Sequence, residues 1–190
     1  NGAAPIRMNF NNGTNNDDHL ASNRGIYRGG KWTLYEGGIR MPCIAKWKGT
    51  IKSGQVSPSL WRTVDWVPTA CSLAGVEIKG IKLDGQDVSD ILLGAQRERN
   101  EPLFWCFQSL LAVREGRWKL VYGEPYNPPF EFTLTPYIQE TGSSEQNNLA
   151  RGKPQLYDLE TDPSEQNNLA AKEPRRTKRM VNLLQKWENN

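Results

Sequence analysis

A glycine-rich segment that carries three cationic side chains is the part of this sequence best suited to chemistry. It spans residues 28–42 (RGGKWTLYEGGIRMP), and its cations are Arg28, Lys31 and Arg40. Glycine lets the backbone turn tightly and approach a ligand closely. A lysine ammonium group together with glycine-flanked backbone N–H groups suits a small tetrahedral anion. The segment therefore predicts an anion-binding loop.

A nucleotide-binding loop is the first alternative for this segment. Residues 25–31 fit the first seven positions of the phosphate-binding pattern G-x-x-x-x-G-K-[ST]. The eighth position is Trp32, which has no hydroxyl group to offer to magnesium. The preceding residues 15–23 are mostly polar, whereas the pattern requires a buried strand. These two departures disfavour a nucleotide site.

The glycine-rich segment resembles a signature of the sulfatase family. That signature is glycine-lysine-glycine-threonine, an aromatic residue, Glu-Gly-Gly, an apolar residue, Arg, an apolar residue and Pro, and it follows an Asp-Asn-Gly motif. The pair Asn1-Gly2 resembles the end of that motif. Further segments resemble later family landmarks in the same order: residues 63–69 (TVDWVPT), 83–85 (LDG), 92–94 (LLG), 112–120 (AVREGRWKL), 156–159 (LYDL) and 162–169 (DPSEQNNL). The resemblance covers most of the chain, except residues 123–153.

The resemblance implies roles for two residues in particular. In the family, the motif asparagine binds a calcium ion, so Asn1 is the candidate metal ligand, and an amide oxygen suits this cation. The family lysine binds a sulfate oxygen, so Lys31 is the candidate catalytic and substrate-binding residue. Its charge would also offset charge that grows on the leaving oxygen. The alternatives are an ordinary loop asparagine and an exposed surface lysine.

Arg28 and His19 are the remaining candidates for substrate contact. Arg28 is close to Lys31 in sequence, and the polar loop that holds His19 lies between Asn1 and Lys31. The alternatives are a surface or structural role for Arg28 and a solvated side chain for His19.

Other polar residues of these segments have simpler expectations. Glu36 and Arg40 are expected to pair locally around the turn, and Asp65 is expected to cap a helix. Trp32 stands where the family commonly has a small glycine. This difference leaves the substrate class open.

The family's nucleophile is absent from this sequence. Sulfatases convert a Cys or Ser inside a Cys/Ser-x-Pro/Ala-x-Arg motif to formylglycine, and neither Cys43, Cys71 nor Cys106 lies in such a motif. Since His19 is the only histidine, the family's motif histidines are missing too. Loss of one member of a cooperating catalytic set already lowers the rate by orders of magnitude. We therefore expect an N-terminal part to be missing and the chain alone to be inactive.

Apolar spacing and turn residues predict the elements that must position these groups. Helices are expected at residues 60–73, at 88–93 and from Pro174 onward, and strands at 44–47, 103–107, 111–114, 118–122 and 156–159. Pro68 is compatible with its helix only if that helix begins near Asp65. Glu115-Gly116 predicts a hairpin turn.

The resemblance implies an α/β fold class with two parts. Residues 1–100 are expected to be the C-terminal part of an alkaline-phosphatase-like α/β sandwich. Residues 101–190 are expected to form a small α+β subdomain with an antiparallel sheet and a terminal helix, and an insertion at 123–153. An independent α+β domain is the alternative.

The parent protein is expected to hydrolyse sulfate esters, with a sulfated small molecule or glycan as substrate. The alternatives are a related phosphoester or phosphonate hydrolase and a non-catalytic module that binds sulfated glycans. A periplasmic, secreted or lysosomal location follows from the resemblance only. A net charge of +3 is too small to imply a nucleic-acid partner, and no apolar run approaches the ~20 residues of a membrane helix.

Overall fold

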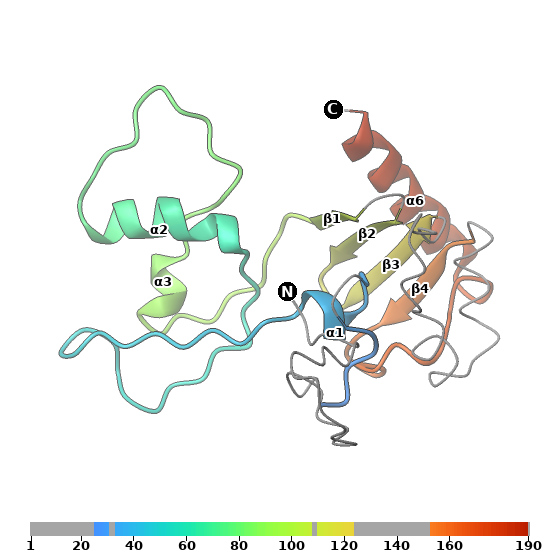
Figure 1. The fold of residues 1–190 in the computed structure, drawn as a ribbon, viewed down its shortest axis with the longest axis horizontal. Helices are drawn as coiled ribbons and strands as arrows, with labels where there is room; N and C mark the ends of the chain where they lie inside the picture. The colour runs from blue at the N-terminus through green and yellow to red at the C-terminus, as the bar shows by residue number, and fades with distance from the viewer. Residues whose placement is uncertain (1–24, 31–32, 108–109, 124–152, 190) are drawn as a thin grey trace, which may run out of the picture. The chain divides into compact units, whose positions relative to one another are not determined.

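The computed structural model describes residues 25–30, 33–107, 110–123 and 153–189 (Figure 1). The chain divides into two compact units. The first, here called the sheet unit, consists of residues 1–41 and 102–190, and the second, the helical unit, of residues 42–101. Each is described by itself.

The sheet unit is built on four antiparallel strands in the order β1-β2-β3-β4. The strands are β1 (Leu103–Phe107), β2 (Leu110–Glu115), β3 (Trp118–Gly123) and β4 (Gln155–Asp158). Gly116 lies in the turn between β2 and β3 with a φ of 56°, a conformation that glycine adopts without steric penalty. The predicted strands of this region and their hairpin are confirmed.

One face of the sheet packs against the long C-terminal helix α6 (Pro174–Glu188) (Figure 1). Pro174 occupies the first turn, where its missing N–H costs no hydrogen bond. Alternate strand residues meet the apolar stripe of the helix, as expected for period-2 side-chain alternation. The shared core contains Leu111, Val113, Leu120, Leu156, Met180 and Leu184. This confirms the predicted antiparallel sheet with a terminal helix.

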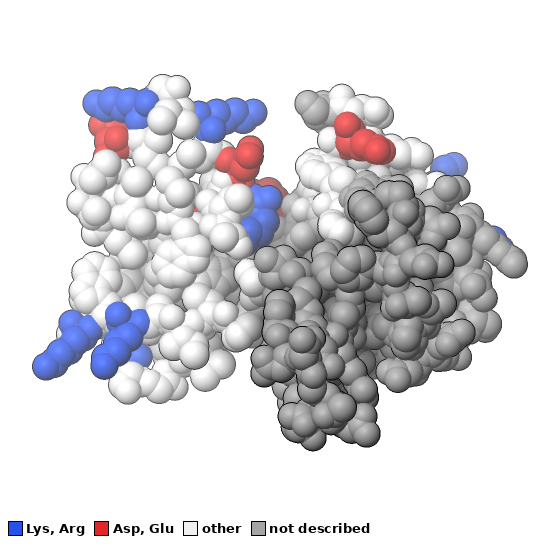
Figure 2. All heavy atoms as spheres, in the orientation of Figure 1, with Lys and Arg blue, Asp and Glu red and all other residues white. Residues whose placement is uncertain are grey.

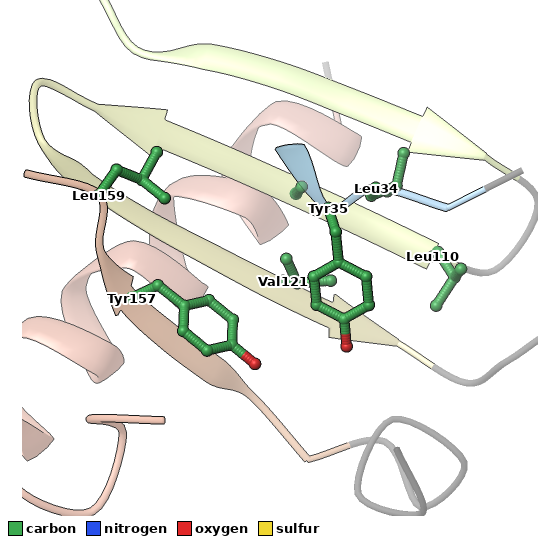
Figure 3. Close-up of a cluster of buried hydrophobic side chains, with 7 residues drawn as sticks. Leu34, Tyr35, Leu110, Val121, Tyr157 and Leu159 are labelled. Carbon is green, nitrogen blue, oxygen red and sulfur yellow. The ribbon is translucent and has the colours of Figure 1, made fainter. Parts of the chain in front are cut away.

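The opposite face of the sheet is covered by the glycine-rich segment. Leu34 and Tyr35 pack on Leu110, Val121 and Tyr157 (Figure 3). The short helix α1 (Glu36–Ile39) follows directly, and Ile39 packs against the same cluster. Residues 25–41 thus join the compact unit that contains the sheet, although the division predicted from sequence assigned them to the preceding domain. The domain boundaries of the parent protein stay a prediction.

The helical unit contains the one-turn 3-10 helix η1 (Thr63–Asp65), α2 (Trp66–Leu73) and α3 (Ser89–Leu92). Pro68 is the third residue of α2, so it falls in the first turn, as its chemistry requires. Both predicted helices are confirmed. The predicted strand at 44–47 is wrong: the described residues of this unit include no strand to pair with it, and Ile44 is 95% exposed.

Asp65 is the polar centre of the helical unit. Its buried carboxylate accepts hydrogen bonds from the Arg99 guanidinium at 2.7 Å and from the backbone N–H groups of Arg62 at 2.6 Å and Gln86 at 2.9 Å. Burial acts to raise the pKa of Asp65, but these donors together lower it. Asp65 does precede α2, yet its side chain makes no cap hydrogen bond to that helix. The carboxylate instead ties three chain segments together.

Charged side chains on the drawn face of the helical unit stand mainly at its margins, and its middle is uncharged (Figure 2). One ion pair of the unit joins Lys79 to Glu77 at 2.9 Å, with both side chains largely exposed. Among the residues that the structure describes, no helix is both long and apolar enough to cross a membrane.

Candidate functional site

Three hydrogen bonds join Gly30 and Thr33 of the glycine-rich segment. The Thr33 N–H donates to the Gly30 carbonyl at 3.0 Å, the Thr33 hydroxyl donates to the same oxygen at 2.8 Å, and the Gly30 N–H donates to that hydroxyl at 3.1 Å. The described residues that precede and follow positions 31 and 32 are therefore held together.

Glycines allow the two halves of the segment to pack backbone against backbone. A side chain at Gly37 would place its Cβ 2.6 Å from the carbonyl oxygens of both Arg28 and Gly29. At Gly38 it would lie 2.5 Å from the Gly30 oxygen. The Gly37 N–H also donates to the Arg28 carbonyl at 2.7 Å. Only glycine fits such a close approach, so these residues shape the segment itself.

A buried ionic cluster fastens the segment to the sheet. The Lys119 ammonium group of β3 lies 2.9 Å from a carboxylate oxygen of Glu36 and 2.9 Å from one of Glu165. Glu165 is in the loop after β4, and its other carboxylate oxygen accepts a hydrogen bond from the Glu36 N–H at 2.6 Å. The Lys119 and Glu165 side chains are fully buried and that of Glu36 is 4% exposed. Three distant parts of the chain therefore meet at one ammonium group.

The two carboxylates of this cluster have opposite pKa shifts. Burial acts to raise the pKa of Glu36, but Lys119 and Arg114 outweigh it and hold that pKa below its ordinary value. Arg114 lies 3.3 Å and Arg40 3.7 Å from the same carboxylate. Burial raises the pKa of Glu165, and the single ammonium of Lys119 only partly offsets it. The expected local pairing of Glu36 with Arg40 is confirmed as one part of a larger cluster.

Arg28, a predicted substrate-binding residue, is buried in the sheet unit. One terminal nitrogen of its guanidinium donates to the Tyr157 hydroxyl at 3.0 Å and to the Glu165 carbonyl at 2.8 Å. The guanidinium also stacks 4.2 Å from the centre of the Tyr35 ring. These contacts give Arg28 a structural role within the segment. Its other terminal nitrogen, Nη2, is buried without a hydrogen-bond partner among the described residues.

The two tyrosines share one acceptor beside Arg28. The hydroxyls of Tyr35 and Tyr157 both donate to the side-chain oxygen of Gln155, at 2.8 and 2.5 Å. Their rings meet edge to face at 6.3 Å and are both labelled in Figure 3. Burial raises the pKa of both phenols, so the hydroxyls act as neutral donors. They link the glycine-rich segment to β4.

The other residues singled out for chemistry lie outside the described part of the chain. These are Asn1, His19 and Lys31, together with Trp32. Their predicted roles stay predictions. Within the described ranges, no group of three His, Cys, Asp or Glu side chains could hold a metal ion.

Sequence reasoning missed Lys119 and Glu165. A usable signal existed for Lys119, since it shares a strand face with Val121, which lies on the side that is buried. A lysine at an inward position of a strand indicates a buried partner. Glu165 had no such signal, because it lies in a loop and its partners are remote in sequence.

Comparison with known proteins places part of this chain in a family. Residues 97–190 match the family model described as the C-terminal region of aryl-sulfatase. This portion, which comprises the sheet, α6 and the Glu165 loop, belongs to that region of the family. The resemblance noted from the sequence motifs is thus confirmed.

Individual relatives extend the similarity beyond that region. The chain is 34% identical to human arylsulfatase A over 141 residues, which cover 71% of this chain and 27% of that enzyme. It is 36% identical to mouse steryl-sulfatase over 119 residues, covering 59% of this chain and 19% of that enzyme. The chain thus spans only a minor part of the length of these relatives.

A solved structure is also similar. It comes from a study of glycosaminoglycan metabolism by Bacteroides thetaiotaomicron. It matches with a TM-score of 0.68 and 28% identity, over 87% of this chain and 32% of the solved chain. The mixed α/β fold, with its four-stranded sheet and C-terminal helix, is therefore that of a sulfatase C-terminal portion.

Proposed function

We propose that this chain is the C-terminal part of an enzyme that hydrolyses sulfate esters. The observation that carries the proposal is homology to arylsulfatases over most of the chain, including the family match at residues 97–190. The buried attachment of the glycine-rich segment to the sheet supports it, because an anion-binding loop must be held rigidly to act in catalysis.

In this proposal Lys31 binds a sulfate oxygen and stabilises charge on the leaving oxygen. The positively charged side chains around the segment favour binding of an anion. Among the described residues, Arg40, Arg114 and Lys119 pair with the carboxylates of Glu36 and Glu165, and Arg28 donates to the Glu165 backbone carbonyl. His19 is proposed to contact the substrate. Arg28 is proposed to reach it through Nη2, the nitrogen that lacks a described partner.

The calcium site and the nucleophile of the proposed active site depend on residues beyond those described. Asn1 is the proposed calcium ligand, and the rest of the calcium site and the formylglycine nucleophile are expected upstream, as in the family. Calcium would offset the negative charge of the bound sulfate. The chain by itself is therefore proposed to be inactive.

The proposed substrate is a sulfated small molecule or glycan, and the proposed location is periplasmic, secreted or lysosomal. Both rest on family membership. The helical unit is proposed to belong to the C-terminal part of an alkaline-phosphatase-like α/β sandwich.

A sulfate-release assay tests the proposal. It compares the full-length protein that contains this chain, the isolated 190-residue chain and a full-length Lys31→Ala variant. We expect activity in the full-length protein, none in the isolated chain, and a fall of about 100-fold or more in the variant, the usual effect of losing one electrostatic stabiliser. Lys48→Ala, which changes an exposed lysine in the helical unit, is the control and should keep full activity.

Activity on phosphate esters without activity on sulfate esters would replace the proposal by the related phosphoester hydrolase. Turnover of neither, combined with binding of sulfated glycans, would favour a non-catalytic module.

A further inference from the structure

We propose that Lys119 is a positioning residue, which fixes the glycine-rich segment, and with it Lys31, by tying Glu36 to Glu165. The inference rests on the proposed function for the role of Lys31. Lys119 itself lies in β3 and in the region that matches the C-terminal family model. The proposal thus gives the C-terminal sheet a part in the chemistry of a segment far earlier in the chain.

The burial of Lys119 is the first support. Its side chain is 0% exposed, and lysine is almost never fully buried unless it is paired. Transfer of an ammonium group from water to a protein interior is costly, so such a group must have close anionic partners. Lys119 has two, each at 2.9 Å. No solvent contact remains for direct catalysis, which favours an indirect role.

The geometry of Glu165 is the second support. Its φ is 53°, which makes it the only described residue other than glycine with a positive φ. Such a backbone costs on the order of 1–3 kcal/mol and persists only where the surroundings impose it. Glu165 makes two hydrogen bonds to the glycine-rich segment: its carbonyl accepts from Arg28, and its carboxylate accepts from the Glu36 N–H. Lys119 holds that carboxylate in place.

Lys31 follows Gly30 directly in the sequence, and the described residues on both sides of it are tied to the cluster. Arg28 and Glu36 lie on either side of the hydrogen-bonded residues Gly30 and Thr33, and the Gly37 N–H is bonded to the Arg28 carbonyl at 2.7 Å. Release of Glu36 and Glu165 would therefore loosen the described residues that precede and follow Lys31 at once. A small displacement of a catalytic group is enough to lower a rate about 100-fold.

A double-mutant cycle in the full-length protein tests the inference. Lys119→Met keeps an unbranched side chain only one atom shorter and removes its charge. We expect it to lower kcat/KM for a sulfate ester about 100-fold beside intact Lys31, and to have little further effect in a Lys31→Ala background. Equal factors in the two backgrounds would overturn the positioning role, because they would show that Lys119 acts independently of Lys31.

Arg99→Met is the matched control. Arg99 is a buried, paired cation of the helical unit, 4% exposed and 2.7 Å from Asp65. Its loss is expected to lower stability as much as Lys119→Met, but any effect on kcat/KM should be equal with and without Lys31. If Lys119→Met does not fold, Glu165→Gln enters the same cycle with the same criteria. That change preserves the side-chain volume and leaves Lys119 paired with Glu36, so it removes only one of the two ion pairs of Lys119.

Hydrogen exchange separates this inference from the proposed function. Lys119→Met is expected to speed exchange of the Gly37 amide by at least about tenfold, as a locally loosened segment would, and to leave the Val76 amide of the helical unit, bonded to Cys71, unchanged. Unchanged exchange at Gly37 would overturn the inference even in an active sulfatase. Faster exchange at Gly37 in a protein that releases no sulfate would instead overturn the proposed function and support attachment of the segment through Lys119.

Discussion

At the scale of single residues, each compact unit depends on carboxylates that are buried and paired. Asp65 in the helical unit accepts from Arg99, and Glu36 and Glu165 in the sheet unit share Lys119. Exposed ion pairs of the same chemical type contribute little, because water and salt screen them. Removal of one partner from a buried pair is different, since it leaves the other charge desolvated and uncompensated.

Asp65→Asn is therefore expected to destabilise the helical unit by about 3–5 kcal/mol. The amide has nearly the same volume, but Arg99 stays buried without an anion. Asp90→Asn is the matched control, because Asp90 pairs with Arg97 at 2.8 Å while both side chains are 38–46% exposed. Its expected cost is about 1 kcal/mol or less. Urea unfolding of both variants measures the difference, and equal costs would contradict the assignment of Asp65 as the polar centre.

At the scale of elements, the described part of the glycine-rich segment is a structural unit made of α1, the residues before it and their contacts with the sheet. Its apolar side chains Leu34 and Tyr35 fill the sheet face, while its backbone folds on itself through Gly37 and Gly38. This packing requires glycine at positions 37 and 38, and the requirement exists without any bound ligand. It also explains why the segment can be rigid with little regular secondary structure.

Gly37→Ala is expected to destabilise the sheet unit by about 1–3 kcal/mol, the usual effect of overpacking. The added methyl group would meet two backbone carbonyl oxygens, which cannot move aside as a flexible side chain would. Gly116→Asn serves as the control: the hairpin position has a φ of 56° and open space around it, and asparagine tolerates that conformation. Thermal unfolding measures both. A larger loss for Gly116→Asn would contradict the packing account.

At the scale of the whole molecule, the buried carboxylates predict how stability depends on pH. The pKa values of Glu36, Asp65 and Asp158 are held below their ordinary values by cationic partners, although burial opposes this for each. Their contribution to stability is present above the ordinary carboxyl pKa of about 4 and is lost as pH falls through the lower folded-state values. Glu165 acts in the opposite sense: its raised pKa gives a contribution that is present at low pH and lost as pH rises through the folded-state value.

The urea midpoint is therefore expected to fall on acidification from about pH 5 to pH 3. Glu36→Gln should flatten this fall, because it removes one carboxylate whose pKa is lowered on folding. In wild type, ionisation of Glu165 lowers stability as pH rises above the ordinary glutamate pKa. Glu165→Gln should remove this second, opposite loss of stability. A midpoint that is constant or rises on acidification would contradict the pKa directions.

The sequence by itself determined the local elements and the family. Apolar alternation, turn residues and the position of Pro174 predicted the strands, the hairpin and the last helix, since these depend on neighbours a few residues away. The motifs and their order indicated the sulfatase family, because both are properties of the linear chain. The strand at 44–47 failed because strand formation requires a partner that local pattern cannot reveal.

Only the tertiary structure decided where the glycine-rich segment packs and what holds it there. Its attachment joins residues far apart in the chain, since Lys119 lies 83 positions and Glu165 lies 129 positions after Glu36. Glu165 looks like an ordinary surface charge in the sequence, and the inward strand position of Lys119 indicates burial without indicating its partners. They become a buried pair only because folding removes water from around them, and a charge without water must then find an opposite charge within about 3 Å.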